Sequence, residues 1–304
     1  MFFGRVNPEK KFTYRKQWWA YGMLIPGFIM MTIFVVIPLV MAIYRSFLSF
    51  GVYDETPEFV GFRNYEYILS DPTFIKSLGN VVLFAVIITV STIVLAFLFA
   101  VAIKALNNKL TTVAKIIIYL PFLLSGVVAS IMFAFIFNYG GGLINSIMIS
   151  LGLDPIAFGK EGIWPYLLII LPSVWLGFGY NTLVLYAGLM NIPKSYYEAA
   201  DIDGASFWRK LFKITIPNMK NYFVLLVVNL ITANLQMFDI PLMMTGGGPD
   251  ESTLTTVLYI YNLYRDTTKS PSISIAASVI LMVPIVIINL LVFKLIRSEK
   301  SQDA

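Results

Sequence analysis

Long apolar runs alternate with shorter polar stretches along this chain, and the runs predict its architecture. A helix needs about 20 apolar residues to cross the hydrocarbon core of a bilayer. Six runs are long enough, and they cover residues 20–47, 78–103, 116–137, 164–190, 222–244 and 273–295. The pattern therefore predicts an all-α integral membrane protein with six transmembrane helices over residues 20–295, between tails at 1–19 and 296–304.

Composition agrees with a membrane protein and excludes several kinds of chemistry. The chain is 58% hydrophobic and 13% charged, whereas about 25% of the residues in a soluble domain are charged. It has no Cys and no His, which removes disulfides, thiolate chemistry and the commonest catalytic base. No Gly-x-x-x-x-Gly-Lys phosphate loop occurs. We expect no catalytic residue, no metal site and no cofactor. If ATP drives the activity of this protein, we expect another chain to supply the ATP site.

Basic residues predict the orientation in the membrane. Most of the 22 Lys and Arg residues lie in the two tails, in the segment after the second run, and in residues 191–220. Loops rich in Lys and Arg stay on the cytoplasmic side. Both termini and the 191–220 segment are therefore predicted to be cytoplasmic.

Residues 191–220, here called the 191–220 loop, form the longest basic stretch between two runs. Ser195 with Glu198 three residues later is typical of a capping box, so a helix is predicted to start at about Tyr196. Gly204 interrupts that helix, since only Gly takes a positive φ without steric cost. A second helix is predicted over residues 205–213, and Pro217 opens the next apolar run.

The second of these helices is amphipathic. Apolar side chains fall on one side and basic ones on the other: Phe207, Trp208, Leu211 and Phe212 against Arg209, Lys210 and Lys213. An ordinary solvated loop does not need large apolar side chains in water. The pattern thus indicates a surface that docks on a partner.

The spacing in this loop resembles the signature loop of ABC importer permeases. The matching pattern is Glu-Ala-Ala at 198–200, Gly204 after three residues, and Ile-Thr-Ile-Pro at 214–217, with Ile216 where Leu is usual. In that family the loop is the coupling helix, which docks in a groove of the cytoplasmic ATPase. The resemblance implies a coupling role for Glu198, Ala199, Ala200, Asp203, Gly204, Phe207, Ile214 and Pro217.

Two further motifs resemble the maltose-type branch of that family, the carbohydrate importer permeases. They are Phe238-Asp239 followed after five residues by Thr-Gly-Gly-Gly-Pro at 245–249, and Trp-Leu-Gly-Phe at 175–178. The resemblance implies the type I permease fold in a bacterial cytoplasmic membrane. It also implies a homologous second permease, two copies of an ABC ATPase, an extracytoplasmic solute-binding protein, a sugar or oligosaccharide cargo and no nucleic acid.

Polar residues within the runs are costly in lipid and usually face the bundle or a cavity. On the fourth run, Ser173, Gly177 and Tyr180 share one helical face. The resemblance places sugar contacts at these three positions. It implies further contacts on the third and fifth runs, at Phe122, Gly126 with neighbouring Ser125, Asn234 and Met237.

A second polar stripe on the fifth run has two interpretations. Asn229, Thr232, Gln236 and Asp239 recur at spacings of three and four, so they share a face. The stripe either lines the substrate path or joins helices by hydrogen bonds.

Three alternatives to a sugar permease remain at this point. A permease for another solute class would share the signature loop but not the Thr-Gly-Gly-Gly-Pro turn. An ion-coupled secondary transporter would need an acidic relay at mid-membrane, where only Asp239 comes near. A membrane enzyme would need a reactive constellation that this sequence does not offer.

Overall fold

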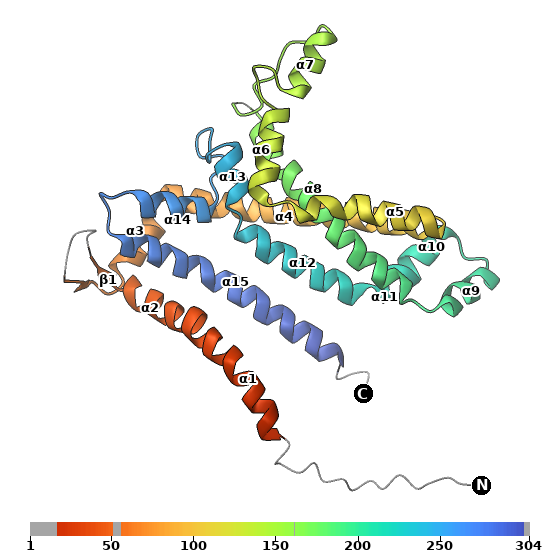
Figure 1. Ribbon diagram of the computed structural model, residues 1–304, viewed down its shortest axis with the longest axis horizontal. Coiled ribbons are helices and arrows are strands. Elements are labelled where there is room, and N and C mark those ends of the chain that lie inside the picture. The colour runs from red at the N-terminus through yellow and green to blue at the C-terminus, as the bar shows by residue number, and fades with distance from the viewer. Residues whose placement is uncertain (1–16, 51–55, 161, 301–304) are drawn as a thin grey trace.

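The computed structural model describes residues 17–50, 56–160 and 162–300, and these residues are mostly helical (Figure 1). The basic tail falls outside the described residues as far as residue 16, as do the last four residues. Within them, the first helix already begins at Gln17 and the last continues to Lys300. Both expected tails are therefore shortened by helix.

Four helical segments of the described residues are long and apolar enough to cross a membrane, and the number rises to six if two bent helix pairs each count as one span. The first is Tyr21–Ser46, which comprises most of α1 (Gln17–Met31), the π-helical turn η2 (Thr32–Val36) and α2 (Ile37–Ser46). The others are α4 (Pro72–Lys104), α8 (Trp164–Met190) and α15 (Pro271–Lys300). The six apolar runs fall in these segments and in the bent pairs.

The first bent pair replaces the single span predicted over 116–137. The prediction of one continuous helix there is wrong. It joins α5 (Asn108–Tyr119) and the 3-10 turn η3 (Leu120–Leu123) to α6 (Gly126–Ile136) at an angle of 97°. The hydroxyl of Ser125 accepts from Val128 N at 3.2 Å and so starts a new helix. Figure 1 shows that α6 and the following α7 (Leu143–Ser150) project away from the bundle.

The second bent pair leads into the fifth run. It joins α10 (Phe207–Lys210), the π-helical turn η4 (Leu211–Thr215) and α11 (Ile216–Asn218) to α12 (Lys220–Leu235) at 66°. The run was predicted to continue to residue 244, but α12 ends at Leu235 and α13 (Asp239–Met244) follows a break. Pro241 cannot donate to the carbonyl of Met237 four residues earlier. That carbonyl accepts instead from the Thr255 hydroxyl at 2.9 Å.

Helix α4 is the centre of the bundle, because it contributes to all four apolar clusters of the core. Phe74 packs with α3 (Arg63–Ser70), α14 (Thr256–Arg265) and α15, whereas Phe84 and Ile88 pack with α8 and the break after α12. Near its other end, Ala96 and Ala100 are fully buried against α8 and α12. Small residues at such a contact allow close helix approach in the absence of a hydrophobic driving force.

One end of the bundle carries the short strands β1 (Leu48–Ser49) and β2 (Glu58–Phe59), which pair antiparallel, together with α3 and α14. There Asp71 caps α4 by accepting from Thr73 N at 2.8 Å, and it also accepts from the Tyr259 hydroxyl at 2.6 Å. Burial raises the pKa of Tyr259, and the bond to Asp71 raises it further. Tyr259 thus stays protonated and ties α14 to the start of α4.

The opposite end of the bundle carries α9 (Lys194–Ile202) and α10, which belong to the 191–220 loop (Figure 1).

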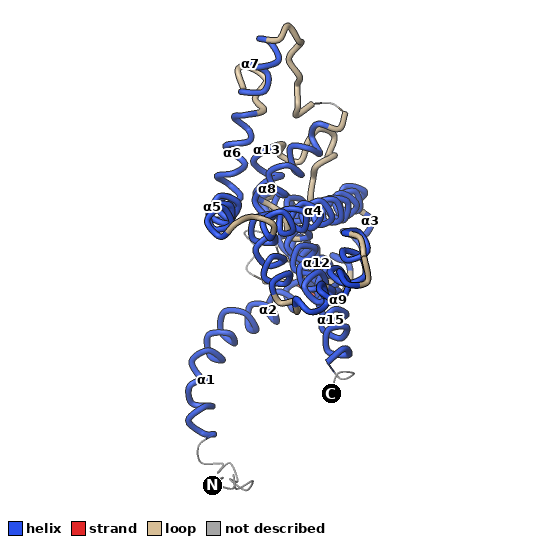
Figure 2. The backbone as a smooth tube through the Cα atoms, turned by 90° about the vertical axis from the view of Figure 1, so that its right-hand side faces the viewer, coloured by secondary structure: helices blue, strands red, loops and turns tan. Residues whose placement is uncertain are grey.

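The first span is less buried than the other spans. None of its most apolar stretch is buried, and only α2 packs on α15. In Figure 2, α1 diverges from α15 toward its own N-terminal end.

Candidate functional site

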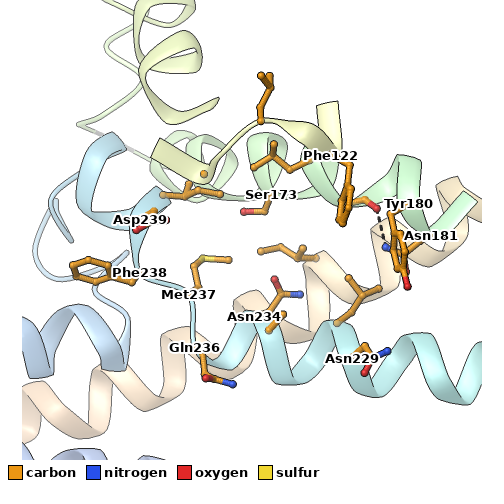
Figure 3. A pocket seen from close by; sticks show the side chains of 18 residues that line it. Phe122, Ser173, Tyr180, Asn181, Asn229, Asn234, Gln236, Met237, Phe238 and Asp239 are labelled. Atoms are coloured by element: carbon orange, nitrogen blue, oxygen red, sulfur yellow. Dashed lines mark hydrogen bonds between the residues drawn. The ribbon is translucent and has the colours of Figure 1, made fainter. Parts of the chain in front are cut away.

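A cavity of about 600 Å³ lies between α8 and α12 (Figure 3). Two helix breaks also border it, one between η3 and α6 and one between α12 and α13. Seven of the eight residues predicted to contact substrate line it. They are Phe122, Gly126, Ser173, Gly177, Tyr180, Asn234 and Met237. The two helix breaks, which sequence patterns did not locate, thus bring the predicted residues of three separate runs together.

Ser125, the eighth predicted residue, does not line the cavity. Its hydroxyl is used in capping α6. Gly126 does line it, and a Cβ there would lie 3.3 Å from a carboxylate oxygen of Asp239. The glycine therefore lets α6 and the start of α13 approach closely at one end of the cavity.

The α8 wall presents polar groups whose bonding is partly committed. Ser173 Oγ donates to the carbonyl of Ile169 at 2.6 Å, so it faces the cavity as an acceptor. The buried Asn181 donates to the carbonyl of Gly177 at 2.7 Å. A Cβ at Gly177 would be in ordinary contact with Thr92, at 3.6 Å, so helix packing does not by itself require a glycine there.

Two aromatic rings form one corner of the cavity. Phe122, from η3, and Tyr180, from α8, stack with centroids 4.9 Å apart and planes 18° apart. Phe122 is 42% and Tyr180 is 39% exposed, so each ring keeps an accessible surface. Such a flat apolar surface suits the apolar face of a ring-shaped solute.

The fifth run contributes side chains from both of its predicted faces. Asn234 is buried and donates to the Thr89 hydroxyl at 3.3 Å, so it joins α12 to α4 as well as lining the cavity. Three members of the polar stripe, Asn229, Gln236 and Asp239, also line the cavity. Thr232 does not, and its hydroxyl accepts from Asn289 on α15 at 3.2 Å. The stripe thus divides into three members that line the cavity and one that joins α12 to α15, and a role of the first three in a substrate path stays a prediction.

Sequence reasoning missed several lining residues. Asn181 lies four residues after Gly177, so the same helical spacing that grouped Ser173 with Tyr180 could have found it. The apolar lining residues Ile88, Leu124, Leu176 and Ile240 carry no signal that separates them from core. Phe238 and Asp239 reach the cavity because α12 ends before them.

The 191–220 loop has the predicted turn but not the predicted cap. Pro193, not Ser195, is the N-cap residue of α9, and no side chain caps this helix. The capping box is therefore wrong, because the chain enters the helix directly after Pro193 and places Ser195 inside it. Ser206 instead caps α10 by accepting from Arg209 N at 3.4 Å. The predicted second helix is shorter and continues as the π-helical turn η4.

Gly204 has a φ of +68°, which confirms the predicted left-handed turn. Ala205 N donates to Ala200 O at 2.9 Å, and Gly204 N donates to Asp201 O at 3.1 Å. This pair of bonds is a Schellman motif, which ends helices at a glycine. The Lys210 ammonium group lies 2.6 Å from Asp201 and holds α10 against α9.

Large apolar side chains of the loop are exposed, as the amphipathic pattern predicted. Phe207, Trp208 and Phe212 are 57%, 64% and 59% exposed, and Leu211 is half-buried. Among the residues with an implied coupling role, Glu198, Ala199, Asp203 and Pro217 are also exposed. Ile214 packs into the core cluster of α4, α8 and α12. The loop thus packs against the bundle through Ile214 and exposes large apolar side chains elsewhere.

A cavity between broken spans, together with an exposed helix–turn–helix at one end of the bundle, is the arrangement expected of a membrane-spanning transport subunit, or permease. Residues 92–300 match the family model described as "Binding-protein-dependent transport system inner membrane component", and the chain belongs to this family. The predictions of an all-α membrane fold and of an importer permease rather than an enzyme are thereby confirmed.

Curated relatives match most of the chain. The sulfoquinovosyl glycerol transport system permease protein SmoG of Agrobacterium fabrum is 36% identical over 247 residues, which is 80% of this chain and 79% of the relative. The sn-glycerol-3-phosphate transport system permease protein UgpA of Escherichia coli is 32% identical over 289 residues, which is 94% of this chain and 96% of the relative.

Solved structures share the fold. A chain of a bacterial ABC transporter involved in the import of the acidic polysaccharide alginate superposes with a TM-score of 0.78 at 22% identity, covering 92% of this chain and 97% of that one. A bacterial alginate ABC transporter solved in complex with an alginate pentasaccharide-bound periplasmic protein also matches, with a TM-score of 0.78 at 23% identity, covering 92% of this chain and 94% of that one. The fold is that of the type I importer permeases.

Proposed function

We propose that this chain is one transmembrane subunit of an ATP-driven importer for a sugar or oligosaccharide, and that the 600 Å³ cavity holds the sugar during passage. The named cargo of one relative is a glycoside, and that of the transporter with the same fold is a polysaccharide. These names support a carbohydrate cargo, and the cavity adds a chemical argument.

The observation that carries the proposal is the combination of amides, hydroxyls and stacked rings around one cavity. A sugar has many hydroxyl groups, which need both donors and acceptors, and it has an apolar face. Asn229 and Gln236 offer exposed amides, Ser173 offers an acceptor, and the Phe122–Tyr180 pair offers a flat surface. Each well-placed hydrogen bond contributes about 0.5–1.5 kcal/mol, so several together give recognition without tight trapping.

Charge within the cavity favours an uncharged sugar. Among the residues that the structure describes, no Lys or Arg lines it, and Asp239 is the charged residue of the lining. A phosphate, sulfonate or uronate group would therefore enter without a cationic partner and next to a carboxylate. We infer that the cargo differs in this respect from glycerol phosphate and alginate.

The 191–220 loop is proposed to be the docking surface for the ATPase. Its exposed Phe207, Trp208 and Phe212 need a partner surface, and the Gly204 turn fixes the angle between α9 and α10. Glu198 and Asp203 add exposed negative charge to the loop. Closure of two ATPase domains would displace this loop and switch the spans between inward and outward access.

The other partners and the orientation follow from the same assignment. A homologous second permease would complete the cavity, and an extracytoplasmic solute-binding protein would deliver the sugar at the α3–α14 end. Residues 20–295 would form the transmembrane domain in a bacterial cytoplasmic membrane, with both termini and the 191–220 loop in the cytoplasm. The distribution of Lys and Arg supports this orientation.

The test is uptake by the complete importer in reconstituted vesicles. The two permeases and the ATPase are reconstituted with ATP inside, and the loaded binding protein is added outside. Uptake of a labelled neutral oligosaccharide that needs ATP and this chain is the expected result. Uptake of sn-glycerol-3-phosphate with no uptake of any sugar offered would contradict the proposed cargo and favour a permease for another solute.

A further inference from the structure

One side chain joins three helices at the α9–α10 end of the bundle. Lys104, in the last turn of α4, donates to the carbonyl of Leu189 near the end of α8 at 3.4 Å. Its ammonium group also lies 4.7 Å from the centre of the Tyr197 ring on α9. A cation is stabilised both at a helix C-terminus and over an aromatic face. Lys104 thus holds α9 to the ends of α4 and α8.

Tyr197 extends this contact to the far side of the 191–220 loop. Its hydroxyl and the Thr215 hydroxyl lie 2.9 Å apart, and Thr215 is buried. Thr215 donates its own proton to the carbonyl of Lys210 at 3.3 Å, so the Tyr197 hydroxyl is the donor of the pair. The bond connects α9 to the π-helical turn η4, which leads into α11 and α12.

The rest of the loop is separated from the bundle by a cavity of about 480 Å³. Its walls include Val101 and Leu189 on the bundle side and Glu198 and Phe207 on the loop side. Lys104, Tyr197 and Thr215 also border it. Tyr197 also packs against the core cluster that Ala100 and Leu189 belong to, so these three residues form a direct contact between α9 and the spans at the edge of this cavity.

Helix α4 continues without a break from this contact to the solute cavity. Lys104 and Thr89 are roughly 22 Å apart along the axis of the same 33-residue helix. Thr89 accepts from Asn234, and its neighbour Ile88 lines the solute cavity. A displacement of the end of α4 therefore reaches the cavity wall through a single rigid element.

We propose that Lys104, Tyr197 and Thr215 form a joint through which movement of α9 is transmitted to α4 and to the solute cavity. They are positioning residues, since they touch neither nucleotide nor solute. The inference rests on the proposed function, because it takes the 191–220 loop as the ATPase docking surface.

The experiment compares ATP hydrolysis with sugar uptake in the same vesicles, using the complete importer. Lys104→Met keeps the length of the side chain but removes its charge and donors. We expect the amount of sugar imported per ATP hydrolysed to fall by about tenfold, a size typical of coupling between two sites. The ATPase should still co-purify, and basal hydrolysis should be unchanged. Tyr197→Phe, which keeps the ring but loses the Thr215 bond, should lower the ratio less.

Two matched variants separate transmission from a general effect of charge or packing. Lys104→Arg restores a cation and donors and should restore the ratio. Lys109→Met removes an exposed cation of α5 five residues further on and should leave the ratio unchanged. Adding Tyr197→Leu to Lys104→Met should produce less than the sum of the two separate losses, because Lys104 and Tyr197 belong to one connected series of contacts.

Three results would contradict the proposal that these residues transmit movement. A ratio for Lys104→Met within about twofold of the unsubstituted importer would show that the contact transmits nothing, being below the range of site-to-site coupling. Loss of ATPase co-purification in both Lys104→Met and Tyr197→Phe would make these residues assembly contacts. If the unsubstituted importer shows no ATP-dependent sugar uptake, the proposed function itself is contradicted, and the proposed joint with it.

Discussion

The carbonyl oxygen of Ile118 occupies the place where a side chain on Gly179 would begin, since a Cβ at Gly179 would lie 1.9 Å from it. Helices α5 and α8 therefore pack backbone to backbone at this point. On α8, Gly179 directly precedes Tyr180. On α5, Ile118 lies three residues before Pro121, which belongs to the turn η3 that carries Phe122. This backbone contact sets the distance between the two walls that hold the stacked rings.

Replacing this glycine should separate those walls. Gly179→Ala forces α5 and α8 apart, and overpacking of this kind costs about 1–3 kcal/mol. We expect a lower thermal midpoint for the purified importer and slower uptake. Gly79→Ala is the matched control, because a Cβ at Gly79 in α4 meets nothing within 4 Å. An equal change in midpoint for the two variants would contradict the close contact.

The turn at Gly204 allows a second comparison within one position. A Cβ there meets nothing within 4 Å, so substitution acts only through the backbone conformation at φ +68°. Gly204→Val should cost about 1–2 kcal/mol and change the angle between α9 and α10. Gly204→Asn should be tolerated, since Asn adopts this conformation more readily. We expect the ATPase to dissociate or uncouple in the first variant only, as measured by co-purification and uptake. Similar behaviour of the two variants would remove the turn from the coupling argument.

Substitutions in the solute cavity should weaken uptake while leaving assembly intact. Tyr180→Ala removes one of the stacked rings and Asn229→Leu removes an exposed amide, each at a cost of roughly 1–3 kcal/mol in recognition. Thr232→Val serves as the control, because this residue lies on α12 but does not line the cavity. Initial uptake rates at low sugar concentration measure the effect. Normal rates for the first two variants, with the control impaired, would move the site elsewhere.

Asp239 predicts a preference between neutral and acidic cargo. A unit charge about 4 Å from a carboxylate at the protein surface meets a repulsion on the order of 4 kcal/mol before screening. We expect the importer to discriminate against a uronate-bearing oligosaccharide of equal length, and Asp239→Asn to reduce that discrimination. Competition between the two sugars during uptake measures it. The binding protein must load both sugars for the comparison to report on the permease. Unchanged discrimination in Asp239→Asn would show that this carboxylate does not set it.

The orientation can be tested cleanly because the chain has no cysteine. Ile202 on α9 is 88% exposed and Tyr264 on α14 is 65% exposed. A cysteine replacing Ile202 should react with an impermeant maleimide only from the cytoplasmic side, and one replacing Tyr264 only from the outside. The opposite result would reverse the proposed topology.

The length of the apolar runs was enough to predict the four continuous spans, because length and composition are local properties of the chain. It could not predict the break between η3 and α6 or the break between α12 and α13. Pro121 and Pro241 lie close to these breaks, but the position of the second break depends on Thr255, which supplies a hydrogen bond to Met237 from 18 residues away. Tertiary contacts of this kind leave no local signal.

The same distinction explains the individual residues at the site. The turn at Gly204 was predictable because its cause is the conformational freedom of one residue. The cap at Ser195 was not, because Pro193 starts the helix two residues earlier. The family resemblance implied a sugar contact for Asn234, but its bond to Thr89 is visible only once α4 and α12 are packed together.

The uncovered first span has a consequence for which part of the chain can be exchanged. Its most apolar stretch is not buried in this protomer, and every residue that lines the solute cavity lies beyond it, from Ile88 onward. The family match likewise begins at residue 92. Replacing the segment ahead of α4 would therefore leave the described residues that line the solute cavity in place, but the replacement would have to pack on α15 as α2 does.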